Sequence, residues 1–153
     1  MLDWSEIVLR LGSAALIGAA IGMNRDLHHK PSGLRTLSLV SLGAASMVMI
    51  ATMEPNDPTA VSRVLQGVMT GLGFLGAGVI VHEASSQKIH GLTTAAAVWV
   101  TACLGSACGI GAWRLVVVAC GLVAIVLAAG GHLEKHLRRR FGKKLDHPPD
   151  DAS

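Results

Sequence analysis

The chain contains 153 residues, of which 51% are hydrophobic and 15% are charged, with 13 Lys and Arg against 10 Asp and Glu. A soluble domain carries about 25% charged residues, so this composition excludes an ordinary water-soluble fold. Aromatic residues make up only 3% of the chain and glycines number 18, a mixture typical of helices that pack closely in lipid. We therefore predict an all-α, polytopic membrane protein.

Five apolar stretches predict five transmembrane helices, each about long enough to cross a hydrocarbon core of ~30 Å. They lie near residues 5–23, 37–53, 64–81, 92–111 and 114–132. The first stretch is the least regular because Glu6 and Arg10 interrupt it, and these two residues stand four apart, where they can form an ion pair. Its alternative is an amphipathic helix lying in the membrane interface, although the stretch lacks a strong polar face.

The basic residues predict the orientation of these helices. Ten of the 13 Lys and Arg lie on the side of the C-terminal tail, and the other side holds Arg10, Arg63 and Arg114. The positive-inside rule then places the C-terminus in the cytoplasm and the N-terminus outside. We divide the chain into a transmembrane domain, residues 1–133, and a basic cytoplasmic tail, residues 134–153, whose last part we expect to be disordered. We expect no nucleic-acid partner.

Polar residues gather at the cytoplasmic ends of the predicted helices. They are Asn24, Arg25, Asp26, Arg35, Thr36, Thr93 and Thr94. We predict a polar cluster open to the cytoplasm, in which Asp26 pairs with one of the arginines. The alternative is that Arg25 and Arg35 are only positive-inside residues whose side chains extend toward the interface.

Glycines are concentrated in the third stretch and at the start of the fourth. They are Gly71, Gly73, Gly76, Gly78 and Gly91. The run predicts either a tight packing seam or a helix broken around a site. Three further pairs have G-x-x-x-G spacing and predict close helix contacts within the chain rather than a dimer face. These pairs are Gly18/Gly22, Gly67/Gly71 and Gly105/Gly109.

The chain lacks the sequence patterns of catalysis. It contains no nucleotide-binding loop and no catalytic triad spacing. Cys103, Cys108 and Cys120 match no metal or disulfide framework. We therefore expect no enzymatic activity, no metal site and no cofactor.

Four segments follow one another in a distinctive order. They are Gly22-Met23-Asn24-Arg25-Asp26, Pro31-Ser32-Gly33-Leu34-Arg35-Thr36, Gly73-Phe74-Leu75-Gly76-Ala77-Gly78 and Gly91-Leu92-Thr93-Thr94-Ala95-Ala96. Together they resemble the MgtC/SapB family of bacterial membrane proteins over residues 8–130. The resemblance implies a transmembrane domain of about five helices in the bacterial inner membrane. Many members carry Glu where this chain has Asn24, and many carry a cytoplasmic C-terminal domain, so the resemblance is to the transmembrane domain only.

The resemblance also implies a function. It is that of a non-enzymatic regulator or interaction protein, associated with magnesium limitation, acid stress, virulence and intracellular survival. The implied partners are the lipid bilayer and other membrane proteins, the ATP synthase or cation transporters among them, and self-association is a further expectation. The alternative is a small transporter or channel for cations such as Mg²⁺, with a path lined by Thr93, Thr94, Thr101 and carbonyls of a broken third helix.

Overall fold

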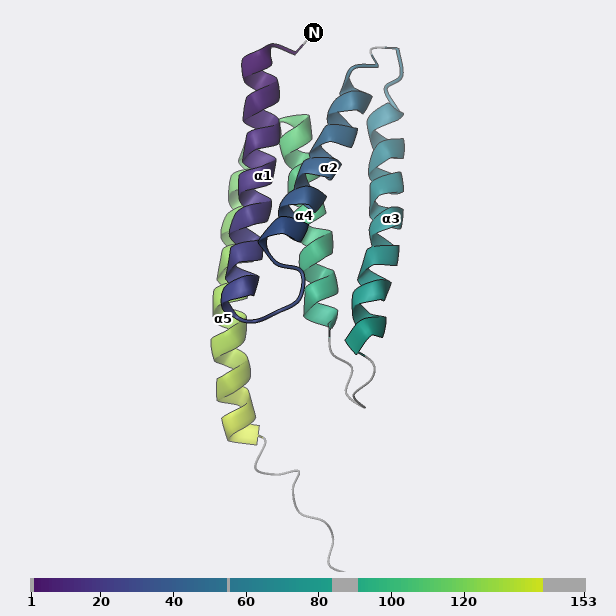
Figure 1. Ribbon diagram of the computed structural model, residues 1–153. Helices are drawn as coiled ribbons and strands as arrows, with labels where there is room; N and C mark the ends of the chain where they lie inside the picture. Colours follow the sequence, from purple (N-terminus) through teal and green to yellow (C-terminus); the bar gives the residue numbers. More distant parts are fainter. Residues whose placement is uncertain (1, 55, 84–90, 142–153) are drawn as a thin grey trace, which may run out of the picture. The chain divides into compact units, whose positions relative to one another are not determined.

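A computed structural model describes residues 2–54, 56–83 and 91–141 of the chain (Figure 1). The described residues form five helices and no strand, which confirms the predicted all-α architecture. The helices are α1 (Trp4–Leu27), α2 (Leu34–Thr52), α3 (Ala60–Glu83), α4 (Leu92–Ile110) and α5 (Trp113–Phe141). The predicted disorder at the C-terminus concerns residues outside the described ones.

Helices α1 to α4 are long and apolar enough to cross a membrane. The apolar part of α5, Trp113–Ala129, is shorter. At 1.5 Å per residue it extends roughly 26 Å, close to the ~30 Å of a hydrocarbon core. Helix α1 is continuous over 24 residues and packs along α2 and α4, as expected of a spanning helix that belongs to the bundle.

Several helices extend beyond the predicted spans. Helix α1 continues to Leu27 rather than residue 23, while α2 begins three residues early at Leu34 and α3 four residues early at Ala60. At the C-terminal end, α5 continues to Phe141 rather than residue 132. Hydropathy marks only the apolar part of a helix, whereas backbone hydrogen bonding continues into the polar residues that flank it.

The first compact unit of the chain, residues 1–119, has α1, α2 and α4 at its centre. Helices α2 and α4 run in the same direction, α1 runs opposite to both, and α3 lies beside α4 and α2 (Figure 1). We name the two ends of this bundle by their arginines. The Arg25 end comprises the end of α1 and the starts of α2 and α4, and the Arg10 end comprises the opposite ends of the same helices.

Glycines bring α1 into direct backbone contact with α2. A methyl group on Gly18 would collide with the backbone of Leu37, and one on Gly22 would lie 2.5 Å from the Cα atom of Leu34. Such contacts maximise dispersion attraction between helices that gain little from the hydrophobic effect in lipid. The predicted intramolecular packing of this G-x-x-x-G pair is confirmed.

The second confirmed pair joins α4 to α2. A methyl group on Gly105 would collide with the backbone of Ser41, and one on Gly109 would lie 2.5 Å from the carbonyl oxygen of Ala45. Both pairs therefore make the same kind of contact with α2. At these four glycines there is no space for a side chain between α2 and its neighbour.

Helix α3 differs from the prediction. It is unbroken from Ala60 to Glu83, so the broken-helix alternative is wrong. Within the described chain, most of this run forms no packing seam, because added methyl groups on Gly71, Gly73 and Gly78 would meet nothing within 4 Å, and the same is true of Gly67. In this set only Gly76 packs, against the side chain of Ala95 on α4 at 3.5 Å. A run of small residues thus shows that close approach is allowed, without showing that a neighbour is present.

The second unit of the chain is residues 120–153, of which the structure describes the continuation of α5. Its apolar side chains, including Leu122, Ile125 and Val126, are largely exposed. This is the surface expected of a helix in contact with lipid. The predicted domain boundary at residue 133 stays a prediction.

Candidate functional site

The Arg25 end is organised around one buried guanidinium group. Arg25 lies in the last turn of α1 and is only 2% exposed. Its Nε and Nη2 atoms donate to the carbonyl oxygen of Pro31 at 3.1 and 3.0 Å, and Nη2 also donates to the hydroxyl of Thr94. Thr94 is itself 2% exposed and lies in the first turn of α4. One side chain therefore ties α1, the following loop and α4 together, and its charge is compensated by charge-assisted hydrogen bonds.

Asp26, the next residue, binds the N-terminus of α2. Its Oδ2 atom accepts a hydrogen bond from the backbone N–H of Leu34 at 2.9 Å. The N-cap residue of α2 is Gly33, which has no side chain to cap the helix, and any Cβ atom there would collide with the Asp26 carboxylate. Among the described residues no ion pair joins Asp26 to Arg35. The carboxylate thus acts as a helix cap supplied from another helix, a role that the sequence analysis missed.

The loop between these helices has an unusual backbone. His29 and Ser32 have φ angles of 52° and 62°, in the left-handed region that non-glycine residues rarely adopt. The loop is held by α1, because the carbonyl oxygen of Arg25 accepts from the N–H of Lys30 at 3.0 Å, and that of Asn24 lies 2.7 Å from Nδ1 of His28. Strain of this kind persists where surrounding contacts fix the conformation.

The electrostatics of this end favour negative charge. Helices α2 and α4 both begin at this end (Figure 1). The positive ends of two helix dipoles therefore lie at the same end as the Arg25 guanidinium, which bonds to Pro31 before α2 and to Thr94 in the first turn of α4. The Asp26 carboxylate offsets the dipole of α2. Helix α4 begins after Gly91, whose φ of 97° requires glycine, and no side chain caps it. The end offers hydrogen-bond donors and positive charge, which suit recognition of an anionic group.

The predicted polar cluster is therefore only partly assembled. The structure brings Arg25, Asp26 and Thr94 together through the loop, with Asn24 half-buried beside them. Three other predicted residues have exposed side chains at the same end: Arg35, Thr36 and Thr93. The alternative of a snorkelling arginine fits Arg35 but not Arg25, which is buried in protein.

A second arginine site lies at the other end of the same helices. Arg10 donates to the Glu6 carboxylate through Nε and Nη2 at 3.2 and 2.6 Å, and through Nη1 to the carbonyl oxygen of Gly109 at 2.8 Å. The predicted ion pair of Glu6 and Arg10 is confirmed, but its link to the last turn of α4 was missed. Gly111, with φ of 82°, lets the chain pass next to this guanidinium, because a Cβ atom there would lie 2.9 Å from it.

Buried hydroxyl groups between the two ends were missed as well. Among the described side chains, four buried hydroxyls have no hydrogen-bond partner: Ser38, Ser41, Thr101 and Ser106. They lie on α2 and α4, with Ser41 where Gly105 approaches α2 and Ser38 where Gly18 approaches it. Each unpaired hydroxyl costs roughly 1–3 kcal/mol. The sequence does show these hydroxyls as polar residues inside apolar spans. The prediction instead emphasised the charged residues near the helix ends.

Comparison with known proteins places this architecture in a family. The family model described as "MgtC family" matches residues 11–136. The chain belongs to the MgtC family. The matched residues include the Arg25 end in full, so its buried arginine and helix cap lie inside the part that defines the family.

Relatives in this family differ in length. The chain is 39% identical over 144 residues to the protein SrpB of Synechococcus elongatus, an alignment that covers 87% of this chain and 79% of SrpB. It is 40% identical over 108 residues to the protein MgtC of Salmonella typhimurium, covering 70% of this chain and 45% of that protein. MgtC of Brucella abortus is 41% identical over 101 residues, 66% of this chain and 41% of that relative. No solved structure matches the chain.

Proposed function

We propose that the protein is a non-enzymatic regulator of other membrane proteins, required when magnesium is limiting or the surroundings are acidic. Support comes from membership of the MgtC family and from relatives that bear the name MgtC. We further propose that it resides in the bacterial inner membrane with the Arg25 end in the cytoplasm, as the distribution of Lys and Arg predicts.

The observation that carries this proposal is the closed packing of α2 against its neighbours. At Gly18, Gly22, Gly105 and Gly109 the helices meet backbone to backbone, with no space for a hydrated cation at these contacts. Helices α2 and α4 contain no Asp or Glu. A magnesium path needs several oxygen ligands or an acidic ring. This centre suits a rigid scaffold that presents surfaces to other proteins.

The Arg25 end is the surface that we assign to recognition. The N-terminus of α4, which no side chain caps, and the exposed Arg35 present positive charge to the cytoplasm in the proposed orientation. An acidic segment of a membrane protein, such as the ATP synthase or a cation transporter, would complement it. Such charges act mainly on the association rate and on partner choice.

The experiment is complementation of a deletion strain across a magnesium series, with intracellular magnesium and ATP measured together. Without the protein we expect disturbed ATP at unchanged magnesium content. Arg35→Glu should fail to restore ATP, whereas Arg114→Glu, which alters an exposed arginine at the Arg10 end, should restore it. A fall in magnesium content that precedes any change in ATP would refute regulation.

A second candidate function is transport of a cation, and the unpaired hydroxyls favour it. Ser38, Ser41 and Thr101 place oxygen atoms inside the bundle that no described residue satisfies. Transport predicts magnesium-dependent flux in liposomes that contain the purified protein, and loss of this flux in Thr101→Val. An absence of flux above that of empty liposomes would exclude it.

A further inference from the structure

The Arg10 end contains a groove that neither the packing nor the proposed function uses. It lies between the last turns of α2 and the first turns of α3 and has a volume of about 570 Å³. Its apolar lining includes Met47, Ile50, Val64, Gly67 and Val68. These residues repeat at intervals of three or four on each helix, so each helix turns one apolar face toward the groove.

The groove is open for an identifiable reason. Gly67 contributes no side chain, and a methyl group added there would meet nothing within 4 Å. Met47 and Ile50 on the opposite wall are 49% and 61% exposed although they face α3. The two helices therefore stand apart at a level where larger residues would have closed the gap.

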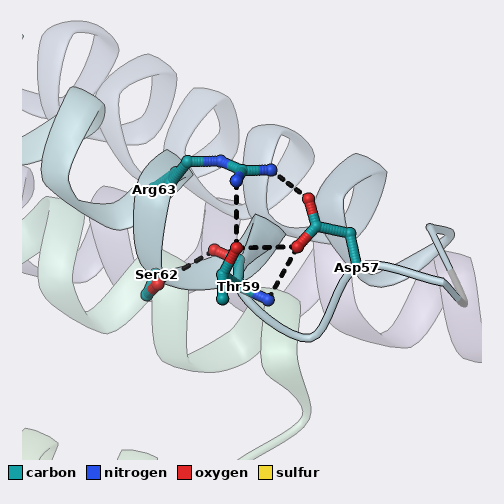
Figure 2. Close-up of polar contacts among 4 residues, drawn as sticks. All are labelled: Asp57, Thr59, Ser62 and Arg63. Atoms are coloured by element: carbon teal, nitrogen blue, oxygen red, sulfur yellow. Dashed lines mark hydrogen bonds and ion pairs between the residues drawn. The ribbon is translucent and has the colours of Figure 1, made fainter.

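The mouth of the groove is polar and carries both signs of charge. Glu54 and Arg63 line it, and Arg63 forms an ion pair with Asp57. Figure 2 shows the arrangement: Thr59 donates its N–H and hydroxyl to Asp57 at 2.9 and 2.7 Å, and its hydroxyl accepts from Nη1 of Arg63 at 3.0 Å. Among the described residues Glu54 forms no ion pair, so its carboxylate is available to a ligand.

The lining of the groove favours a lipid over a protein helix. From Met47 to the end of α2 its walls are apolar, and charged side chains stand only at its mouth, Glu54 just beyond α2 and Arg63 on α3. A lipid has the same division into an apolar chain and a charged headgroup. An extended acyl chain is also thinner than an α-helix of about 10 Å diameter and is present at high concentration in any membrane.

We propose that this groove binds a phospholipid with a primary ammonium headgroup, of the phosphatidylethanolamine type. Its acyl chain lies between α2 and α3, its phosphate is near Arg63, and its ammonium group is near Glu54. The charges select this class. The carboxylates of Glu54 and Asp57 outnumber the Arg63 guanidinium, so the mouth has a net negative charge that disfavours an anionic lipid. A primary ammonium group is also preferred to a quaternary one, because it can donate hydrogen bonds.

The test is native mass spectrometry of the full chain, exchanged into mixtures of phosphatidylethanolamine, phosphatidylcholine and phosphatidylglycerol with identical acyl chains. We expect one retained phosphatidylethanolamine per chain, preferred over phosphatidylglycerol by roughly two- to fivefold, as for a partly exposed ion pair. Gly67→Leu should fill the groove and abolish retention. Gly73→Leu is the matched control, because Gly73 lies on the same helix, is equally open, and does not line the groove.

A second variant tests the headgroup separately from the acyl chain. Glu54→Gln should keep a bound lipid but lose the preference for phosphatidylethanolamine. Equal lipid retention by Gly67→Leu and Gly73→Leu would overturn the proposal. So would an unchanged preference in Glu54→Gln, or a second copy of the chain bound in place of the lipid.

Discussion

Gly22 offers a direct test of the packing between α1 and α2. In Gly22→Ala the new methyl group would lie 2.5 Å from Cα and 2.7 Å from N of Leu34, and 2.8 Å from C of Gly33. These are backbone atoms, which cannot rotate away. The shortest contact falls about 0.9 Å below the 3.4 Å at which ordinary contact begins, so α1 and α2 must separate.

The size of the effect follows from three contributions. Overpacking costs about 1–3 kcal/mol. Separation also moves Leu34 away from the Asp26 carboxylate, and a lost helix cap costs about 1 kcal/mol. Replacing a glycine in a helix returns about 1 kcal/mol. We therefore expect Gly22→Ala to lower the free energy of unfolding by roughly 1–3 kcal/mol.

The assay is unfolding in detergent or bicelles followed by circular dichroism, with Gly12→Ala as control. Gly12 lies on the same helix, and a methyl group there would meet nothing within 4 Å. Gly12→Ala should be neutral or stabilising by up to about 1 kcal/mol. If the two variants proved equally stable, the close approach of α1 and α2 would be refuted.

Three further predictions concern other parts of the chain. Arg10→Leu should destabilise the protein by about 1–3 kcal/mol in the same unfolding assay, because the carbonyl of Gly109 loses a charged donor. If the variant were as stable as the wild type, this contact would be dispensable. Ser41→Ala should be neutral or stabilising, since the hydroxyl that it removes has no partner, and a clear loss of stability would instead indicate a hidden ligand. The pKa of Asp57 lies below its usual value of 3.8, chiefly because Thr59 donates to its carboxylate. The stabilisation of the folded state by this carboxylate is present above pH 3.8 and is lost as pH falls through the lowered pKa. NMR titration of the Asp57 carboxyl carbon would measure this pKa. A pKa at or above 3.8 would contradict the prediction.

The sequence was sufficient to predict the helices and much of their packing. Charge-free runs mark helices in lipid because charged side chains are expensive there, and paired glycines such as Gly18 and Gly22 permit backbone contact. The same spacing at Gly67 and Gly71 gave a wrong prediction of packing. Glycine spacing shows that a helix surface permits close contact with another helix. Whether a neighbouring helix covers that surface depends on the arrangement of the whole bundle.

The candidate site was harder to predict because two of its partners are backbone atoms. The carbonyl of Pro31 and the N–H of Leu34 bind Arg25 and Asp26, and neither group has a signature in the sequence. Side-chain complementarity suggested that Asp26 would pair with an arginine. The structure shows a role that this reasoning did not suggest: Asp26 caps the start of α2, which Gly33 leaves uncapped, and this depends on how closely α1 and α2 approach.

The two arginines of α1 have a consequence for the membrane itself. Arg10 and Arg25 lie fifteen residues apart, roughly 22 Å along the helix, which is less than the ~30 Å of a typical hydrocarbon core. Neither depends on water for its hydrogen bonds, because Arg10 bonds to Glu6 and Gly109, and Arg25 bonds to Pro31 and Thr94. The bundle thus carries its own polar boundaries at a fixed separation, and the surrounding bilayer can vary in thickness without drawing either charge into contact with lipid tails.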